Sequence, residues 1–349
     1  MTGTTTHGVT ATIRRALAGS FLLMLTAMGH AQSSTSHDDR GVRPNDGGEP
    51  EEITVVLAVL DIIEIEDRAQ VFLADIYLEV GWRDPRLALN DDRAAGLRTF
   101  AVGEIWTPGL TILNDRGLKN LLPERATVDR LGNVTARQRL AGSLSVDLDL
   151  HDFPFDTQQL PVQLASYRYS PSEVVFSRES RMTANADELS GDGWAYAETQ
   201  PEHSVFRLSD GAGGRSLLTF KVVAERSAAY YALTMLLPMT LILCLAWTVH
   251  WLPVDLIPAR MGTASATVFS LIAFGISLRL TLPKIAYLTV ADLFVLFSTL
   301  LVLGSLAVTV LSARWVGAAR EDAALRLARW TRLLFPFAYL VVGLLTVMA

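Results

Sequence analysis

Long apolar runs crowd into the last third of this 349-residue chain, and they constrain its fold more than any other feature. The runs occupy residues 232–252, 261–278, 285–313 and 333–349. A helix that crosses a bilayer needs about 20 such residues. Trp247 and Trp251 stand near the end of the first run, and such aromatic residues favour the membrane–water interface. The sequence therefore predicts a four-helix membrane domain over 228–349.

A further apolar run near the N-terminus has a different character. Arg14 and Arg15 precede a short apolar segment, and small residues follow it at 29–31. This order is typical of a secretory signal peptide, so residues 1–31 are predicted to be cleaved after Ala31. An uncleaved anchor is the alternative. Residues 32–50 are poor in apolar side chains, and we expect a disordered linker there.

The charges flanking the runs predict their orientation. The segment 314–332 carries five arginines against Glu321 and Asp322. Such an excess lies on the cytoplasmic side of a membrane. We therefore expect a multi-pass protein of the plasma or bacterial inner membrane, with its polar N-terminal domain outside the cytoplasm.

Residues 51–227 read as an all-β, immunoglobulin-like sandwich. Stretches such as "VFLADIYLEV" are β-rich and roughly alternating, and turn signals such as 209–214 separate them. The segment shows no catalytic or metal-binding motif, so we expect neither an enzyme nor a cofactor. The net charge of −6 argues against nucleic acid as a partner. Cys244 is the sole cysteine, which excludes a disulfide within the chain.

The second apolar run is unusually rich in hydroxyl groups, which are costly against lipid unless they find partners. They belong to Thr263, Ser265, Thr267, Ser270 and Ser277. One interpretation is a helix buried among other helices. The other is a helix that lines a water-filled pore. Because four helices rarely enclose such a path alone, a pore would need several copies of the chain.

Several motifs together resemble one family, the pentameric ligand-gated ion channels of the Cys-loop receptor superfamily. The stretch "VDLDLHDFPFDTQQL" (146–160) is similar to the family's signature loop. The segments 104–115, 224–238 and 258–287 are similar to its W-x-P segment, its first membrane junction and the glycine-receptor pore helix. Val146 and Leu160 occupy the places of the bracketing cysteines, so the disulfide is absent, as in prokaryotic members.

The resemblance implies a homopentamer in membrane lipid, with a central path for inorganic ions that opens when an unidentified small-molecule agonist binds. It places Arg260 at the cytoplasmic mouth of the pore. The implied pore face continues through Gly262, Ala266, Phe269, Ala273 and Ile276. A competing face, rotated by one residue, carries Thr263, Thr267, Ser270 and Ser277. In the first register, five Phe269 rings form a dry constriction that can block ions by dewetting.

The residues at the start of this helix bear on whether the pore prefers anions or cations. Pro258 suits a first helical turn, and Ala259 stands where cation channels of the family have a carboxylate. Helix N-termini carry partial positive charge and attract anions. The sequence predicts an anion-preferring pore. A cation channel that uses Asp255 or the vestibule is the alternative.

The same resemblance implies how binding reaches the pore. Asp156 is expected to pair with Arg226, and Asp67 with Lys284. The coupling set is Asp67, Phe153, Pro154, Phe155, Asp156, Arg226, Pro283 and Lys284. Phe153-Pro154-Phe155 would press on the loop 280–288. The agonist would lie between subunits, near Tyr167, Tyr169 and Arg215 of one and Tyr77 of the next. Because arginine prefers carboxylates, an acidic or zwitterionic agonist is possible.

Two other functions stay open at this point. One is proton gating through the outer carboxylates and His151. The other is a membrane-anchored receptor that never conducts, although a mere anchor does not need a hydroxyl-rich second span.

Overall fold

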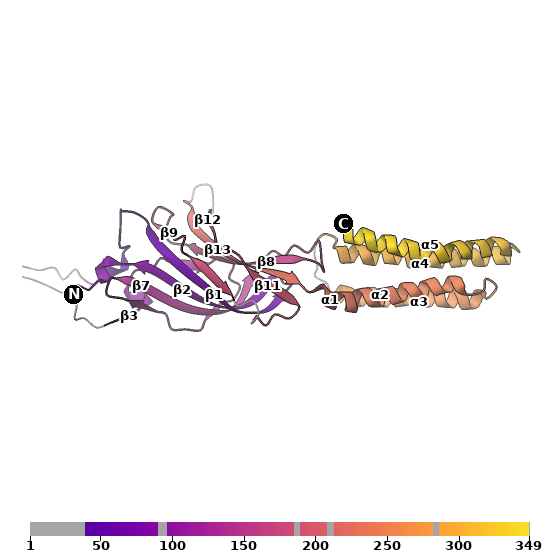
Figure 1. Ribbon diagram of the computed structural model, residues 1–349, viewed down its shortest axis with the longest axis horizontal. Helices are drawn as coiled ribbons and strands as arrows, with labels where there is room; N and C mark the ends of the chain where they lie inside the picture. Colours follow the sequence, from indigo (N-terminus) through magenta and orange to yellow (C-terminus); the bar gives the residue numbers. More distant parts are fainter. Residues whose placement is uncertain (1–38, 90–95, 185–188, 208–212, 282–285, 349) are drawn as a thin grey trace, which may run out of the picture.

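The computed structural model describes residues 39–89, 96–184, 189–207, 213–281 and 286–348. The predicted signal peptide, 1–31, and the coupling candidates Pro283 and Lys284 lie outside this part of the chain. Figure 1 shows an elongated molecule with all strands at one end and the long helices at the other. The two parts are consecutive in sequence, since Ser227 alone separates the last strand from the first helix.

The N-terminal half is a two-sheet β-sandwich. The larger sheet has the order β10-β1-β2-β7-β6-β3, with β5 on β7 and β9 on β1. The smaller has the order β11-β13-β8-β4, with β12 on β13. The strands are β1 Glu51–Glu66, β2 Val71–Arg83, β3 Arg98–Ala101, β4 Leu110–Ile112, β5 Lys119–Asn120, β6 Arg125–Val128, β7 Asn133–Ser145, β8 Thr157–Ser166, β9 Val174–Phe176, β10 Arg181–Ala184, β11 Trp194–Glu198, β12 Glu202–Phe206 and β13 Arg215–Arg226.

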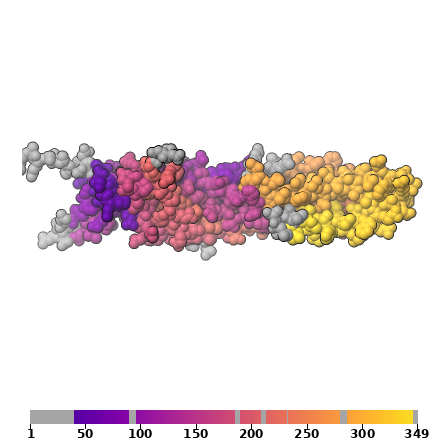
Figure 2. Space-filling view, turned by 90° about the horizontal axis from the view of Figure 1, so that it is seen from above, coloured from indigo at the N-terminus to yellow at the C-terminus, as the bar shows by residue number. Residues whose placement is uncertain are grey.

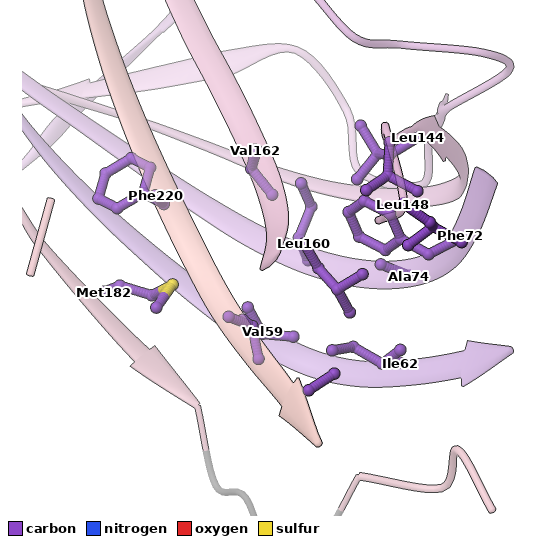
Figure 3. Packing of buried hydrophobic residues seen from close by; sticks show 14 of the residues in the cluster. Val59, Ile62, Phe72, Ala74, Leu144, Leu148, Leu160, Val162, Met182 and Phe220 are labelled. Carbon is purple, nitrogen blue, oxygen red and sulfur yellow. The ribbon is translucent and has the colours of Figure 1, made fainter. Parts of the chain in front are cut away.

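Alternating side chains explain why the sheets face each other. Along β2 every second residue is buried, from Phe72 to Trp82, as expected for a strand with one face against a core. Figure 3 shows the result: Phe72 and Ala74 of the larger sheet lie close to Leu160 of the smaller one. The predicted all-β sandwich is confirmed.

Residues 39–50 differ from the expected disordered linker. They contain a short 3-10 helix, η1 (Asp39–Gly41), and a buried arginine. Arg43 is only 6% exposed, and its Nη1 donates to the backbone oxygen of Glu49 at 3.1 Å. This hydrogen bond holds a segment that its composition alone marked as disordered.

The C-terminal part consists of helices long and apolar enough to cross a membrane. The candidate spans are Ala228–Trp251, Ile257–Leu278, Val290–Gly317 and Glu321–Leu344. The first contains α1 (Ala228–Tyr231), a π-helical turn η5 (Ala232–Leu236), α2 (Leu237–Thr248) and the 3-10 turn η6 (Val249–Trp251). The others are α3 (Ile257–Thr281), α4 (Val290–Gly317) and α5 (Glu321–Met348). Figure 1 shows the helices running side by side, and Figure 2 shows the same elongated outline with this part of the chain at one end.

Two helix boundaries differ from the sequence prediction. The third helix begins at Val290 rather than 285, because Thr289 and Asp292 form a capping box before it. The fourth begins at Glu321 rather than 333. Its first turns have too many charges to read as a membrane span, yet Ala324 and Ala328 are buried next to Val254. Helix propensity and this small contact outweigh the low hydropathy.

Candidate functional site

A buried arginine holds the two parts of the molecule together. Arg226, the last residue of β13, is 6% exposed. Its Nε donates to Asp156 Oδ1 at 2.8 Å, and its Nη2 donates to Asp67 Oδ1 at 2.7 Å. Burial alone would lower the pKa of Arg226, but hydrogen bonds and charges from the two carboxylates outweigh it and raise that pKa. The predicted Asp156–Arg226 pair is confirmed.

Asp67 has a different partner from the one expected. It is bound to Arg226 through both carboxylate oxygens, whereas the sequence suggested Lys284, which lies outside the described residues. Asp67 sits in the β1–β2 turn and Asp156 in the loop before β8, so this one guanidinium joins three distant segments. Because both carboxylate oxygens of Asp67 already accept hydrogen bonds from Arg226, Asp67 is less available to bind a second cation.

Aromatic rings surround the same guanidinium. Its Cζ lies 4.1 Å from the ring centroid of Trp194, 4.9 Å from that of Phe153 and 5.6 Å from that of Tyr231. Cation–π attraction strengthens when the cation is removed from water. The Tyr231 hydroxyl also accepts a hydrogen bond from Arg226 Nη1 at 3.1 Å. Because Tyr231 belongs to α1, the arginine contacts the membrane part directly. Trp194 was not anticipated from the sequence.

The signature loop, residues 146–156, touches the start of α4. The backbone oxygens of His151 and Phe153 accept hydrogen bonds from Val290 N and Ala291 N at 3.0 and 3.2 Å. Phe153 is 1% exposed, and the Phe153–Pro154 peptide is cis. Phe155, in contrast, is 53% exposed, so the expectation that both rings press on the membrane part is wrong for Phe155 within one chain.

Tyr287 is the point where the loop meets the segment before α4. The hydroxyl of Tyr287 accepts a hydrogen bond from Leu150 N at 3.0 Å. Its ring stacks on His151, with centroids 3.9 Å apart and planes 8° apart. His151 Nδ1 lies 2.6 Å from Asp149 Oδ1, and this hydrogen bond lowers the pKa of Asp149. The loop was expected to contact 280–288, and Tyr287 is the described part of that contact.

Gln158 closes the neck of the loop without a disulfide. Its Nε2 donates to Asp149 O at 2.6 Å, and its Oε1 accepts from Asp149 N at 3.0 Å. The same Nε2 lies 2.6 Å from Asp156 Oδ2. Val146 and Leu160, which stand at the cysteine places, are both buried. Sequence reasoning missed Gln158, although its position two residues after Asp156 puts both on one face of the strand.

Helix α3 has one face packed and the opposite face free. The packed face contains Arg260, Ala264, Thr267 and Leu271, which are at most 5% exposed. The free face, about half a turn away, contains Gly262, Ala266, Phe269, Ala273 and Ile276, which are all exposed in the single chain. Phe269 is 71% exposed and Ile276 is 59% exposed. This free face is the one that the family resemblance implied, and the competing register has Thr267 buried.

Arg260 does not lie on that free face, which corrects the prediction that it lines the pore. It is 2% exposed. Its Nη1 donates to Ser312 Oγ at 2.8 Å, and its Nε donates to Val249 O at 3.3 Å. The reason is helical geometry: Arg260 is two positions before Gly262, which places it on the far side of α3. Its Nη2 has no hydrogen-bond partner among the described residues.

The residues expected to bind an agonist fall into two groups on different sheets. Tyr167 follows β8 and is 56% exposed. Arg215 begins β13, and its Nε donates to Tyr167 O at 2.8 Å. Its Nη1 donates to Gly213 O and Gly214 O. Tyr169 is less available, because its hydroxyl accepts from Trp106 Nε1 at 2.8 Å and its ring packs on that indole.

Tyr77 forms the second group, on β2 of the larger sheet. It is half-buried and lies opposite Arg139 of β7. Arg139 pairs with Asp75 at 2.7 Å and Arg137 with Glu79 at 2.8 Å; these hydrogen bonds raise the pKa values of both guanidinium groups. The arginines were not anticipated, although their i, i+2 spacing in "ARQRL" places them on one face. A single chain therefore offers two partial sites.

Comparisons with known proteins agree with this architecture. A family model described as the neurotransmitter-gated ion-channel ligand binding domain matches residues 31–209. A second, described as the neurotransmitter-gated ion-channel transmembrane region, matches residues 235–343. The chain therefore belongs to the neurotransmitter-gated ion-channel family of the Cys-loop superfamily, with an extracellular β-sandwich followed by membrane-spanning helices.

Curated relatives include subunits of one receptor type. The chain is 29% identical over 261 residues to the gamma-aminobutyric acid receptor subunit pi of Bos taurus, which covers 72% of this chain and 58% of the relative. It is 27% identical over 285 residues to a gamma-aminobutyric acid receptor subunit beta-like protein of Drosophila melanogaster, at 77% and 57% coverage. The chain thus spans less than two thirds of the length of these relatives.

Proposed function

We propose that this chain is one subunit of a ligand-gated ion channel in which five copies surround a pore lined by α3. In this proposal residues 51–227 form the ligand-binding domain and residues 228–349 the pore domain. The observation that carries it is the free face of α3, which is exposed in the single chain and lies opposite a face whose residues are packed against the other described helices.

The composition of the free face favours a pore over lipid. The outward faces of α2, α4 and α5 carry exposed leucines, among them Leu241, Leu300 and Leu340. The free face of α3 instead carries the small residues Gly262, Ala266 and Ala273 alongside Phe269 and Ile276. Small residues leave room along an axis, and a ring of Phe269 side chains supplies a hydrophobic constriction that closes by dewetting.

We infer that the pore prefers anions. Pro258 and Ala259 stand at the start of α3, where no carboxylate precedes the helix closer than Asp255. The helix N-terminus adds partial positive charge. Arg260 adds a full charge behind the pore wall and has no carboxylate partner among the described residues. A cation-selective pore would need Asp255, which is exposed, to override this field.

We propose a zwitterionic amino acid as the class of agonist. Tyr167 and Arg215 of one subunit would face Tyr77 and Arg137 of the next. Arg215 keeps its Nη2 group without a hydrogen bond in the described part of the chain, so it can still bind a carboxylate. The aromatic rings would hold the ammonium group. Since the relatives are named as gamma-aminobutyric acid receptor subunits, that compound is the first ligand to test.

The remaining expectations complete the proposal. The single cysteine and the direct turn from α4 into α5 resemble prokaryotic members of the superfamily. We accordingly place the channel in a bacterial plasma membrane, as a homopentamer whose signature loop is closed by Gln158 instead of a disulfide.

Cysteine accessibility tests the pore assignment. Cys244 on α2 is exposed, so the background is Cys244→Ser. In reconstituted protein, Phe269→Cys is expected to lose current when an anionic methanethiosulfonate reagent is added in the open state. The matched control is Thr267→Cys, two residues away on the packed face. Block at position 267 but not at 269, or the absence of any conductance under a screen of amino acids and pH, would contradict the proposal.

A further inference from the structure

A cavity of about 600 Å³ lies within one subunit, outside every site described above. It is bounded by β9, the segment after β9, β12 and the start of β13, which lie side by side along one edge of the sandwich (Figure 1). Its floor is apolar and includes Val175, Phe176 and Leu217. Its exposed polar lining, the rim, is Arg178, His203 and Ser204. Ser180 and Ser216 also line it but are buried, and their hydroxyls bond to Val55 N and Val174 O.

The charge on this rim is one-sided. Among the described residues that line the cavity there is no carboxylate. The nearest acid in sequence, Glu179, is exposed and is not part of that lining, Glu202 pairs with Lys221 at 2.7 Å, and Glu173 accepts hydrogen bonds from Ser170. Arg178 is exposed and forms no hydrogen bond or ion pair with any residue that the structure describes. The cavity thus offers a cationic rim with unused donors above an apolar floor.

We infer that each subunit binds a small carboxylate with an apolar body in this cavity. The carboxylate would accept charge-assisted hydrogen bonds from Arg178, which suits planar anions, with His203 and Ser204 beside it. The apolar body would cover Phe176 and Leu217. A neutral molecule of the same shape would gain only the second contact.

The cavity also adjoins the proposed agonist site. Ser216 lines it and donates from Oγ to Val174 O at 2.6 Å, which ties β13 to β9. The preceding residue, Arg215, holds Tyr167. An occupant would therefore brace the β12–β13 hairpin at the end that carries Arg215, and we expect it to change agonist sensitivity. This last step rests on the proposed channel function, whereas the binding itself does not.

Calorimetry on the purified full chain in detergent tests the site, with benzoate as probe and benzamide as its neutral match. Benzoate is expected to bind, and Arg178→Gln is expected to weaken binding by about 10-fold or more, the range for a hydrogen bond to a charged group. The control is Arg181→Gln, which removes the same charge from β10 at an exposed position outside the cavity.

The outcomes separate the claims. Absence of benzoate binding to the unmodified chain, equal binding of benzamide, or equal loss in both variants would overturn the site. If Arg178→Gln alone loses binding, the site stands. Benzoate should then shift the agonist concentration–response curve in the unmodified channel and not in Arg178→Gln. An unshifted curve with binding intact would remove the link to the agonist site only.

Discussion

Two buried arginines mark the two ends of the membrane part, and their surroundings are opposite. Arg226, at the outer end, has two carboxylate partners and three aromatic rings around it. Arg260, at the inner end, has a serine hydroxyl and a backbone oxygen as its hydrogen-bond partners in the part of the chain that the structure describes. The first arrangement binds segments to one another, because a charge with its counter-charges is costly to separate. The second leaves a positive field at the start of the helix that we propose lines the pore.

This difference suggests that one residue type has two tasks. At the outer junction two carboxylates neutralise the charge of Arg226, so this residue acts by holding neighbouring segments together and its electrostatic effect is short in range. At the inner end no carboxylate among the described residues pairs with Arg260, so in the proposed channel its field would extend to ions that pass the free face of α3. The following predictions test that division, beginning with the largest expected effect.

The largest expected effect is the loss of protein stability when Arg226 loses one of its two carboxylate partners. Asp156→Ala leaves Arg226 buried with one carboxylate, and breaking a buried pair costs about 3–5 kcal/mol. We expect the thermal midpoint of the assembled protein in detergent to fall sharply. Asp67→Ala should cost less, because Asp67 is 18% exposed and water can replace it in part. Equal, small losses in both variants would show that the junction does not depend on this charge cluster.

The second largest expected effect is the loss of stability when Gln158, at the neck of the signature loop, is replaced. Gln158→Leu removes an amide that bonds to both backbone atoms of Asp149 and to the buried carboxylate of Asp156, and a buried group left without its partner costs about 1–3 kcal/mol. The neighbouring Gln159 is exposed, so Gln159→Leu is the matched control. Thermal unfolding should separate the two variants by several degrees. If they behave alike, the loop is held by Val146 and Leu160 rather than by Gln158.

The inner arginine should affect selectivity rather than stability. Arg260→Met removes a buried charge that has no counter-charge, a change that is often neutral or stabilising. Across a helix about 10 Å wide, one charge is worth about 0.4–1.7 kcal/mol at effective dielectric constants of about 80 to 20.

The same charge favours an anion and disfavours a cation by this amount, so the anion-to-cation permeability ratio should fall by about 4-fold or more. Reversal potentials in asymmetric chloride measure this ratio, with Arg260→Lys as the variant that keeps the charge and should keep the preference. A ratio that is unchanged in Arg260→Met would assign selectivity to the helix N-termini or to Asp255, and the comparison between the two arginines would lose its functional half.

The smallest effect concerns pH at the outer junction. The His151 contact lowers the pKa of Asp149, so the unfolded chain binds more protons than the folded one just below the ordinary value of about 4. Stability from this contact is present above that pH and is lost as pH falls through the lowered pKa. His151→Phe keeps the stacking on Tyr287 but removes the contact. Its thermal midpoint should depend less steeply on pH between about 3 and 4.5, and an identical slope would contradict this account.

Much of the fold could be predicted from residues because its signals are local. The alternation along β2 and the apolar runs each report which face of an element meets water. The Asp156–Arg226 pair was predictable only from family resemblance, since the two residues are 70 positions apart. The partner of Asp67 could not be read from the sequence, because two cations were available and only packing decides which is nearer.

The sequence by itself determined the β-sandwich and the membrane helices, because periodicity and hydropathy act within a single element, whereas the choice between the two candidate faces of α3 came from the family resemblance. Tertiary structure alone decided that Arg260 bonds to Ser312 and Val249, that Asp67 bonds to Arg226, and that Gln158 closes the loop. In each case the reason is the same: a long polar side chain bonds to whichever partner the packing of other elements brings within about 3 Å, and sequence spacing does not specify that partner.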